Sequence, residues 1–352
     1  MIDWSSAATH LLLNPRLPAE ERMKLEALAQ AAPSLGRHVW VSTSGTSGAL
    51  KLVALSKDAI LSSAAAVNAH LDAQRSDVWS RVLPSFHVGG IGIDARAHLT
   101  GSRVEVFDWD PQRFARGGFT LSSLVPAQVR DLVTAKLRVP GGLRAIVVGG
   151  GSLPDDLHAA ASQLGWPLLP SYGLSEAASQ VATATPGSTD LRILSHLRVR
   201  IDDGRIVLSG SSLLTGYAFP DGEGRPVFVD PKIDGWFVTE DRGEVEGSLL
   251  RVFGRSRDFV KIGGESVDLV RLDRVLDEVR GSVDAAILAV SDDRLGHVIH
   301  VATTAADAQP IVEAFNASVL PFERIRAVHR VDSIPRTPLG KLRRQELSEK
   351  VR

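Results

Sequence analysis

The sequence predicts an α/β protein with more than one domain. Strand-like runs alternate with helix-like runs up to Thr185, hairpin signals follow, and a third pattern of short helices and strands begins after Arg257. Alternating strands and helices are typical of layered α/β domains. The length of 352 residues exceeds the size at which one hydrophobic core usually stops growing. We therefore expect a large N-terminal domain at 1–256, with a β-rich subdomain at about 186–256, and a C-terminal domain at 257–352.

The first part of the chain contains both helix and strand signals. A helix is expected at 18–32, because Pro18 opens it, acidic residues follow and apolar residues recur at helical spacing. A short strand is expected at 39–41, and an Ala-rich helix from Ser56 to about His70. Further strands are expected at 103–107, 121–125 and 143–148, and further helices begin at Pro126 and Pro154.

Past Thr185 the pattern changes to short strands. Strands at 198–201 and 205–208 flank the turn signal Asp203-Gly204, which is typical of a β-hairpin. More strands are expected at 236–238 and 249–253. The C-terminal region has the size and alternation of a small α+β domain. Its expected elements are a helix at 269–279, a strand at 285–290, a helix at 310–319 and a strand ending at Val331.

The composition excludes several classes of function. Lys+Arg 40 and Asp+Glu 41 nearly cancel, so bulk charge does not favour binding to nucleic acid or to an anionic membrane. The absence of cysteine excludes disulfides and thiolate metal sites, and it fits a reducing cytoplasm. The sequence has no apolar run long enough to predict a membrane span, and its first residues lack the pattern of a secretory leader. We expect a cytoplasmic protein that binds small molecules and does not insert into a membrane. The sequence is compatible with a monomer or a homo-oligomer.

Residues 43–51 form the first candidate site. Hydroxyl groups and glycines are crowded here after a strand and before a helix, and a lysine ends the segment. Glycines let backbone N–H groups approach phosphate oxygens, hydroxyls add donors, and a lysine neutralises charge. The spacing is not that of a Walker loop, and these residues alone are equally compatible with a flexible loop without a ligand. The expected phosphate contacts are Thr43, Ser44, Gly45, Thr46, Ser47, Gly48 and Lys51.

This segment resembles the phosphate loop of the adenylate-forming superfamily, which includes acyl-CoA synthetases, adenylation domains and luciferases. A second match in the family's order is similar to its Tyr-Gly-x-Thr-Glu element and comprises Ser171, Tyr172, Gly173, Leu174, Ser175 and Glu176. The resemblance implies that the Ser175 hydroxyl meets the nucleotide phosphates and that Glu176 holds Mg²⁺. A carboxylate suits this hard cation, which neutralises the triphosphate. Without the resemblance, Glu176 would be interpreted as a solvated acid at a helix end.

Two further motifs resemble family elements around the nucleotide ribose and the domain boundary. Residues 234–241 are similar to Gly-Trp-Phe-x-Thr-Gly-Asp, whose last aspartate accepts hydrogen bonds from the ribose hydroxyls, so Asp241 is expected to bind ribose. Residues 254–258 resemble the interdomain segment. There the resemblance implies that Arg255 reaches the ribose and that Arg257 marks the hinge.

The last motifs concern the C-terminal domain. Gly263 and Gly264 are similar to the glycine segment that lines the pantetheine channel in the family's synthetases. Residues 335–341 resemble the motif whose lysine bridges the substrate carboxylate and the α-phosphate, so Lys341 is the expected main catalytic group. Taken alone, Lys341 would be a solvated cation in a basic tail. Five motifs in one order favour the family over coincidence.

The resemblance implies a fold, cofactors and a two-step reaction. The fold is that of adenylate-forming enzymes, with a small mobile C-terminal domain. A carboxylate attacks the α-phosphate of ATP and forms acyl-AMP and pyrophosphate, while Mg²⁺, Lys51 and Lys341 stabilise charge. The C-terminal domain then rotates about the hinge, and coenzyme A attacks the adenylate. ATP, Mg²⁺ and coenzyme A are therefore the expected cofactors and cosubstrates.

Residues 83–96 indicate which carboxylic acid is the substrate. His87 matches a family histidine that gates the acyl pocket, although a lone histidine is more often structural. Arg96 lies in an apolar stretch, where a guanidinium must pair with Asp94 or another acid, or bind an anion. This spacing is similar to the o-succinylbenzoate:CoA ligases of menaquinone biosynthesis, in which the arginine contacts the aromatic carboxylate. Two further segments are similar to the same ligases. The resemblance implies that Gly149, Gly150 and Gly151 bind the nucleotide and that Ser179 and Gln180 bind the acid.

Several departures from the family pattern leave alternatives. Only 42 residues precede Thr43, so we expect much of the usual N-terminal subdomain to be absent. Leu50 replaces a proline, and Glu240 adds a negative charge beside Asp241. Another aryl- or fatty-acyl-CoA synthetase is the first alternative. The second is a non-catalytic nucleotide-binding remnant, against which the retained Lys51, Glu176, Asp241, Arg255 and Lys341 argue.

Overall fold

The structure is a computed structural model that describes residues 2–43, 51–255, 259–262, 265–292, 294–337 and 342–351. Contacts divide the chain into two compact units. The first comprises Met1–Thr239 and Gly243–Val252, and the second comprises Glu240–Arg242 and Phe253–Arg352. Each unit is described by itself. None of the helices in these ranges combines the length and the hydropathy that spanning a bilayer requires.

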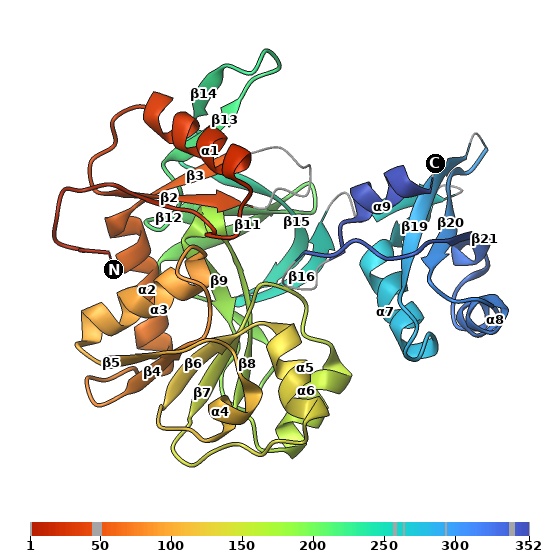
Figure 1. Cartoon of the computed structure of the whole chain (residues 1–352), viewed down its shortest axis with the longest axis horizontal. Coiled ribbons are helices and arrows are strands. Elements are labelled where there is room, and N and C mark those ends of the chain that lie inside the picture. The colour runs from red at the N-terminus through yellow and green to blue at the C-terminus, as the bar shows by residue number, and fades with distance from the viewer. Residues whose placement is uncertain are drawn as a thin grey trace. The chain divides into compact units, whose positions relative to one another are not determined.

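An eleven-stranded sheet forms the centre of the first unit within the described part of the chain (Figure 1). Its order is β11-β12-β15-β16-β10-β9-β8-β7-β6-β4-β5. The strands β5, β4, β6, β7 and β8 pair in parallel, whereas β8 and β9 pair in antiparallel fashion. The bounds are β4 Val78–Arg81, β5 Arg103–Val106, β6 Leu121–Leu124, β7 Ala145–Val148, β8 Leu168–Leu174, β9 Ser179–Thr183, β10 Leu191–Ile193, β11 Leu197–Asp202, β12 Arg205–Gly210, β15 Phe237–Glu246 and β16 Leu249–Arg255.

Helices cover both faces of the parallel strands (Figure 1). In β7 every residue is buried: Ala145 and Val147 pack with α2 and α3, whereas Ile146 and Val148 pack with α4, α5 and α6. This two-sided burial explains why the inner strands β6 and β7 are short continuous runs of small or apolar residues. The helices are α2 Lys57–Leu71, α3 Val88–Thr100, α4 Pro111–Ala115, α5 Pro126–Thr134 and α6 Asp155–Gln163.

A second sheet in the first unit has the order β1-β2-β3-β13-β14. Helix α1 (Ala19–Ala31) packs Leu25 and Leu28 onto it, against Trp40, Leu52 and Ala54. The sheet thus stabilises α1 by covering the face of the helix that carries Leu25 and Leu28. The strand bounds are β1 His10–Leu12, β2 His38–Thr43, β3 Lys51–Ser56, β13 Gly216–Pro220 and β14 Pro226–Val229.

The N-terminal segment is attached to the start of α2 by a buried cation. Lys57 is 0% exposed, and its Nζ donates to the carbonyl oxygens of Asp3 (2.6 Å) and Ser6 (3.0 Å) and to Ser6 Oγ (3.1 Å). Three oxygens replace the water that the ammonium loses on burial. Ser56 caps the same helix, because its Oγ accepts the N–H of Ala59 at 3.0 Å.

The second unit contains a five-stranded sheet in the order β18-β17-β20-β19, with β21 paired to β20. Helices α7 and α8 pack on one side of it, and the other side carries a smaller cluster that includes Leu347 of α9. The bounds are β17 Phe259–Ile262, β18 Glu265–Asp268, α7 Leu269–Val279, β19 Ala285–Asp292, β20 Gly296–Thr303, α8 Gln309–Ala317, β21 Ile325–Arg330 and α9 Arg344–Lys350.

The predicted α/β class is confirmed, and one local prediction needs correction. Residues 43–51 do not lead directly into a helix, because β3 lies between this segment and α2. Hairpin pairing with β2 and burial on both faces favour the strand. The apolar stretch around Arg96 is helix α3 despite its glycines and β-branched residues. Packing of the buried Ile91 and Ile93 overrides their low helix propensity.

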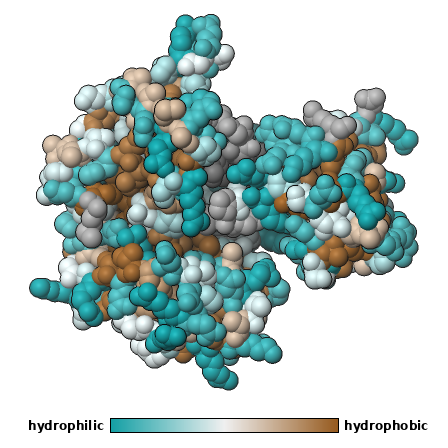
Figure 2. Space-filling model, in the orientation of Figure 1, coloured by the Kyte–Doolittle hydropathy of each residue, from teal (hydrophilic) through white to brown (hydrophobic). Residues whose placement is uncertain are grey.

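The surface of this fold mixes apolar and hydrophilic side chains, as Figure 2 shows for one face. Single exposed apolar residues are normal on soluble surfaces and need no partner. The large apolar side chains that are most exposed among the described residues are Met23, Leu99, Val106, Val229, Ile233, Phe253, Leu320 and Val328.

The histidine between β10 and β11 makes stability depend on pH. Burial lowers the pKa of His196 from 6.5 to about 4. Below the unfolded value the unfolded chain takes up a proton that the folded protein does not, so stability falls as pH drops from about 6.5 to about 4. We expect His196 to contribute up to about 3 kcal/mol of this loss. Urea unfolding of wild type and His196→Gln at several pH values measures it, and identical pH profiles would contradict the prediction.

Candidate functional site

The carboxyl ends of four parallel strands bring the predicted residues to one edge of the sheet. Strands β4, β6, β7 and β8 are parallel, so their carboxyl ends share an edge, where ligands bind in open α/β sheets. His87 follows β4, the Gly149–Gly151 run follows β7, and Glu176 follows β8. The sequence therefore positions residues 87, 149–151 and 171–176 together through strand order alone.

The glycine run after β7 makes close backbone contacts. Gly149 N–H donates to Leu124 O at 3.1 Å, which joins the run to the end of β6. Gly150 has φ +79°, a conformation that residues with a Cβ rarely adopt. A Cβ on Gly150 would lie 3.3 Å from Val125 Cγ1. These glycines thus leave backbone exposed at the sheet edge, as a nucleotide-binding turn requires.

The turn between β8 and β9 carries the second group of predicted residues. Ser171 and Tyr172 pair with Thr183 and Ala182, and the register shifts at Gly173. The turn contains the short helix η1 (Ser175–Ala177), which holds Ser175 and Glu176, both partly buried.

This turn is held in an unusual backbone conformation. Ala178 has φ +57° and Ser179 has φ +148°, in regions that side-chain-bearing residues seldom occupy. A Cβ on Gly173 would lie 2.0 Å from Ser179 O, so only glycine fits there. Outliers of this kind cluster at ligand sites, where the surrounding structure holds them.

Lys51, Glu176 and Tyr217 form a contact cluster from three separate segments. Lys51 Nζ lies 3.7 Å from Glu176 Oε1 and 3.8 Å from the centre of the Tyr217 ring. Tyr217 Oη donates to Glu176 Oε1 at 2.9 Å. The side chains of Lys51 and Glu176 are 31% and 15% exposed, so they remain accessible to a ligand. The structure brings together Lys51 and Glu176, which are 125 positions apart in the sequence.

Tyr217 is a site residue that sequence reasoning missed. Strand β13 was not predicted, and nothing in the motif order marked its tyrosine. The available signal was composition, since the chain has only two tyrosines and the other is Tyr172 of the β8 motif. Its hydroxyl orients the Glu176 carboxylate, and its ring face attracts the Lys51 ammonium.

Glu176 fits a magnesium ion held partly by phosphates. Mg²⁺ is commonly bound through one or two carboxylates together with substrate phosphates, rather than by an all-protein cage. Within the described residues, no group of three or more histidine or acidic side chains could hold a metal ion. A partly buried carboxylate next to a lysine is thus compatible with a Mg²⁺–triphosphate.

Arg96 is fully buried and lacks a carboxylate partner within the described chain. It is 1% exposed, its Nη1 donates to Ser123 Oγ at 3.2 Å, and its guanidinium lies 5.3 Å from the Trp79 ring centre. Asp94 instead pairs with Arg81 at 3.0 Å, which removes one of the two predicted alternatives. Burial lowers the pKa of Arg96 to about 10, so the guanidinium stays charged near neutral pH.

Space beside Arg96 is kept open by a glycine. A Cβ on Gly92 would lie 3.0 Å from Arg96 Nη2 and 3.8 Å from Ser179 Oγ. Arg96 Nε makes no hydrogen bond to any residue of the described ranges. Arg96 and Ser179, both predicted to bind the acid, therefore flank the same small space, and an anion there would complete the guanidinium's hydrogen bonds.

Gln180 and His87 lie near the same edge in different environments. Gln180 is 4% exposed, and its Oε1 accepts the Thr183 hydroxyl at 2.6 Å, so it supports β9 from inside. His87 begins α3 and is partly buried, with its ring 4.6 Å from that of Phe86. Burial lowers the pKa of His87, which favours the neutral imidazole expected of a pocket wall.

The other predicted residues are placed only in part. Asp241 lies in β15, partly buried beside the exposed Glu240. Thr43 ends β2 opposite Lys51, and Arg255 ends β16, but the structure describes the backbone alone for both. Residues that lie outside the described ranges are Ser44, Gly45, Thr46, Ser47, Gly48, Leu50, Arg257, Gly263, Gly264 and Lys341.

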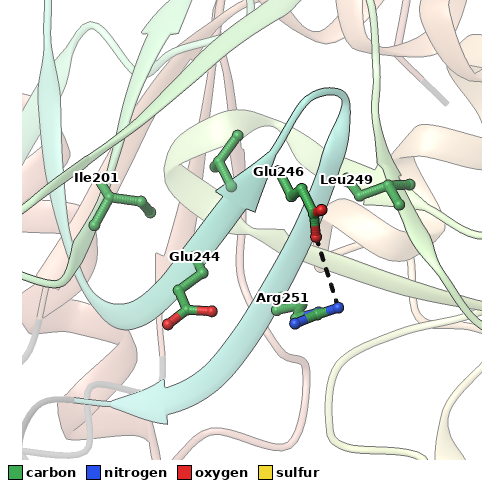
Figure 3. Close-up of a pocket in the computed structure, with 6 residues that line it drawn as sticks. Ile201, Glu244, Glu246, Leu249 and Arg251 are labelled. Atoms are coloured by element: carbon green, nitrogen blue, oxygen red, sulfur yellow. Dashed lines mark ion pairs between the residues drawn. The ribbon is translucent and has the colours of Figure 1, made fainter.

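A pocket away from this edge contains none of the predicted residues. It has a volume of about 310 Å³ and lies on the β15–β16 hairpin (Figure 3). Glu244, Glu246 and Arg251 line it with Ile201, Val245 and Leu249, and Glu246 pairs with Arg251 at 3.7 Å. Two carboxylates would repel a nucleotide, and none of the predicted binding residues lines this pocket. We therefore assign the candidate site to the sheet edge, where the charges are complementary to phosphate.

The close packing of Gly173 in the β8–β9 turn predicts that adding one methyl group there destabilises the protein. Gly173→Ala should lower the free energy of unfolding by about 1–3 kcal/mol, because the new Cβ overlaps Ser179 O. Gly141→Ala is the matched control, since a Cβ there meets nothing within 4 Å, and it should change stability by less than about 0.5 kcal/mol. Denaturant unfolding of both variants checks this, and equal stabilities would show that the turn accommodates a side chain.

Known proteins match this chain over most of its length. The 2-succinylbenzoate–CoA ligase of Salmonella typhimurium is 34% identical over 271 residues, which cover 75% of this chain and 58% of that protein. A "probable 2-succinylbenzoate–CoA ligase" of Mycobacterium tuberculosis is 31% identical over 331 residues, covering 87% of this chain and 82% of that protein. This chain thus spans little more than half of the Salmonella relative.

A solved structure has the same fold. The o-succinylbenzoate CoA synthetase of Bacillus subtilis, in complex with its acyl-adenylate intermediate, superposes with a TM-score of 0.78 at 24% identity, covering 88% of this chain and 68% of that one. The predicted fold of adenylate-forming enzymes is thereby confirmed. Residues 38–218, just over half of the chain, match the family model described as AMP-binding enzyme. This protein is therefore a member of the AMP-binding enzyme family.

Proposed function

We propose that this protein is an ATP-dependent acid:CoA ligase that converts 2-succinylbenzoate to 2-succinylbenzoyl-CoA in menaquinone biosynthesis. In the first step the substrate carboxylate attacks the α-phosphate of ATP, which forms acyl-AMP and releases pyrophosphate. In the second step the thiol of coenzyme A attacks the acyl carbon and releases AMP. The observation that carries this proposal is the buried, charged Arg96 without a carboxylate partner in the described chain.

The sheet edge supplies the groups for the first step. Lys51 lies beside the Glu176 carboxylate and can neutralise the β- and γ-phosphates that leave as pyrophosphate. Glu176, oriented by Tyr217, would hold Mg²⁺, which when bound neutralises the triphosphate. We assign the phosphate contacts of residues 43–48, the ribose contacts of Asp241 and Arg255, and the bridging role of Lys341 to the same step.

Arg96 selects an acid with a second carboxylate. An unpaired guanidinium in an apolar environment is costly, and an incoming carboxylate would repay that cost through charge-assisted hydrogen bonds. Ser123 and Trp79 fix the guanidinium from one side, while Gly92 and Ser179 leave space on the other. Fatty acids and benzoate have no second carboxylate to occupy this site. This difference favours 2-succinylbenzoate over the substrates of other acyl-CoA synthetases.

The relatives support the same substrate. Both matched ligases are named for 2-succinylbenzoate, and a second Bacillus subtilis structure holds ATP and a magnesium ion at a TM-score of 0.78. We extend these ligands to this chain as part of the proposal.

The second step is assigned to the C-terminal domain. We propose that residues 257–352 form the mobile domain, with the hinge at Arg257 and the coenzyme A channel at Gly263 and Gly264. His87 is proposed as the gate of the acyl pocket, because burial lowers its pKa and favours the neutral imidazole, and because it follows β4 at the sheet edge. The cysteine-free composition is compatible with a reaction in the cytoplasm.

Pyrophosphate exchange tests the activity. We expect exchange of labelled pyrophosphate into ATP in the presence of 2-succinylbenzoate, and CoA thioester formation when coenzyme A is added. Benzoate and fatty acids are the comparison substrates, and exchange should be at least about tenfold slower with them at equal concentration. Faster exchange with a fatty acid would support a general acyl-CoA synthetase. Absence of exchange with every acid would support a non-catalytic remnant of the family.

Arg96→Met separates a binding role from a structural one. Removing a buried charge without an acidic partner should leave stability unchanged or raise it by about 1 kcal/mol or more. The same change should raise the KM for 2-succinylbenzoate roughly 100-fold, equivalent to about 3 kcal/mol of lost binding. Arg113→Met, at an exposed position of helix α4, is the control and should leave the KM unchanged and alter stability by less than about 1 kcal/mol. A variant with lower stability and an unchanged KM would show that Arg96 is structural.

A further inference from the structure

The described segments on both sides of Lys341, Pro335–Arg336 and Leu342–Arg343, lie side by side and are called the neck here. Arg336 and Leu342 make an antiparallel bridge, and Arg343 N–H donates to Pro335 O at 2.9 Å. The segments that end at Thr337 and begin at Leu342 are therefore held next to each other. Lys341 lies outside the described residues and directly precedes Leu342 in the sequence.

One ion pair fixes the neck from the C-terminal side. Arg344 Nη2 lies 2.5 Å from Asp273 Oδ2 of helix α7, and Arg344 Nη1 donates to Ile287 O at 2.5 Å. Asp273 Oδ1 also accepts the N–H of Ile287 at 2.9 Å, which links α7, β19 and Arg344 in a closed ring. The two charged side chains are only 20% and 25% exposed, and burial raises the pKa of Asp273.

A second ion pair fixes the neck from the N-terminal side. Arg336 Nη2 lies 2.7 Å from Asp284 Oδ1, with side chains 33% and 40% exposed. Asp284 directly precedes β19, and its carbonyl accepts the N–H of Thr304 at 3.0 Å. Both arginines of the neck are thus connected to the region where α7 leads into β19.

Docking of this segment does not require the ion pairs. Ile334 and Leu347, which lie before and after the neck, are buried at 6% and 0% exposure and pack with Ala286, Leu288 and Ala302. Apolar burial is non-directional, whereas arginine–carboxylate pairs are directional and contribute little net stability at partly exposed positions. The pairs are therefore better suited to orienting the neck than to holding it on the domain.

We propose that Asp273 and Asp284, acting through Arg344 and Arg336, are positioning residues for Lys341 in the adenylation step. This inference rests on the proposed function, in which Lys341 bridges the carboxylate and the α-phosphate. A displacement of about 1 Å at a reacting group can cost roughly 100-fold in rate, so a loosened neck affects this step selectively. The thioester-forming step does not use Lys341 and should be insensitive to the neck.

Separate assays of the two half-reactions test the proposal. Asp273→Asn and Asp284→Asn should each lower the kcat of pyrophosphate exchange at least about tenfold, with the KM values for ATP and 2-succinylbenzoate within about threefold of wild type. Thioester formation from chemically prepared acyl-adenylate and coenzyme A should stay within about twofold. Exchanging the charges of the more exposed pair, in Asp284→Arg with Arg336→Asp, should restore much of the exchange rate.

Two controls interpret the result. Lys341→Ala should abolish exchange and retain thioester formation, which defines the pattern expected of a misplaced lysine. Arg271→Gln breaks the Arg271–Glu323 ion pair of the same unit, away from the neck, and should leave both half-reactions unchanged. Equal losses in both half-reactions, or unchanged exchange in the aspartate variants, would overturn the positioning role. A wild-type protein without exchange would instead contradict the proposed function.

Discussion

The burial of parallel strands on both faces is the constraint on which the first unit depends. Because β4, β6, β7 and β8 have helices on each side, they are built mainly from apolar residues and small serines, and the charged groups lie beyond the strand interiors. Their shared direction then places His87, the glycine run after β7 and the β8 motif on one edge. The candidate site is thus a consequence of how the core is covered, and its residues can be far apart in the sequence.

Sequence reasoning reached the fold class and many elements because their signals are local. Helix α7 begins and ends at the predicted residues, since Asp268 caps it and its apolar residues recur at helical spacing. Helix α3 was missed because its glycines have low helix propensity. The reason they are tolerated is tertiary: a Cβ on Gly90 would lie 2.2 Å from Pro84 O. Strand β3 was missed because its apolar run is compatible with the start of a helix.

Site residues that belong to a recognisable sequence motif could be predicted. Contacts between residues from distant segments could not. Glu176 and Lys51 were predicted separately, but their proximity and the part of Tyr217 depend on β3, η1 and β13 meeting in space. For Arg96, the sequence left pairing with Asp94 or another acid and anion binding as alternatives. Geometry excludes Asp94 as the partner, because Asp94 pairs with Arg81 at the end of β4. Ser123, which supports the guanidinium, has no sequence signal of its own.

The hairpin that joins β2 to β3 has an electrostatic consequence for the phosphate loop. Thr43 and Lys51 are paired strand residues, and α2 begins only at Lys57, where Ser56 already caps its first turn. Because β3 separates Lys51 from the first turn of α2, the macrodipole of α2, which falls off within that turn, does not act at Lys51. The cation that the described residues place here is the Lys51 ammonium, which is 31% exposed. Its attraction for a polyanionic ligand, such as the nucleotide proposed above, is screened as ionic strength rises.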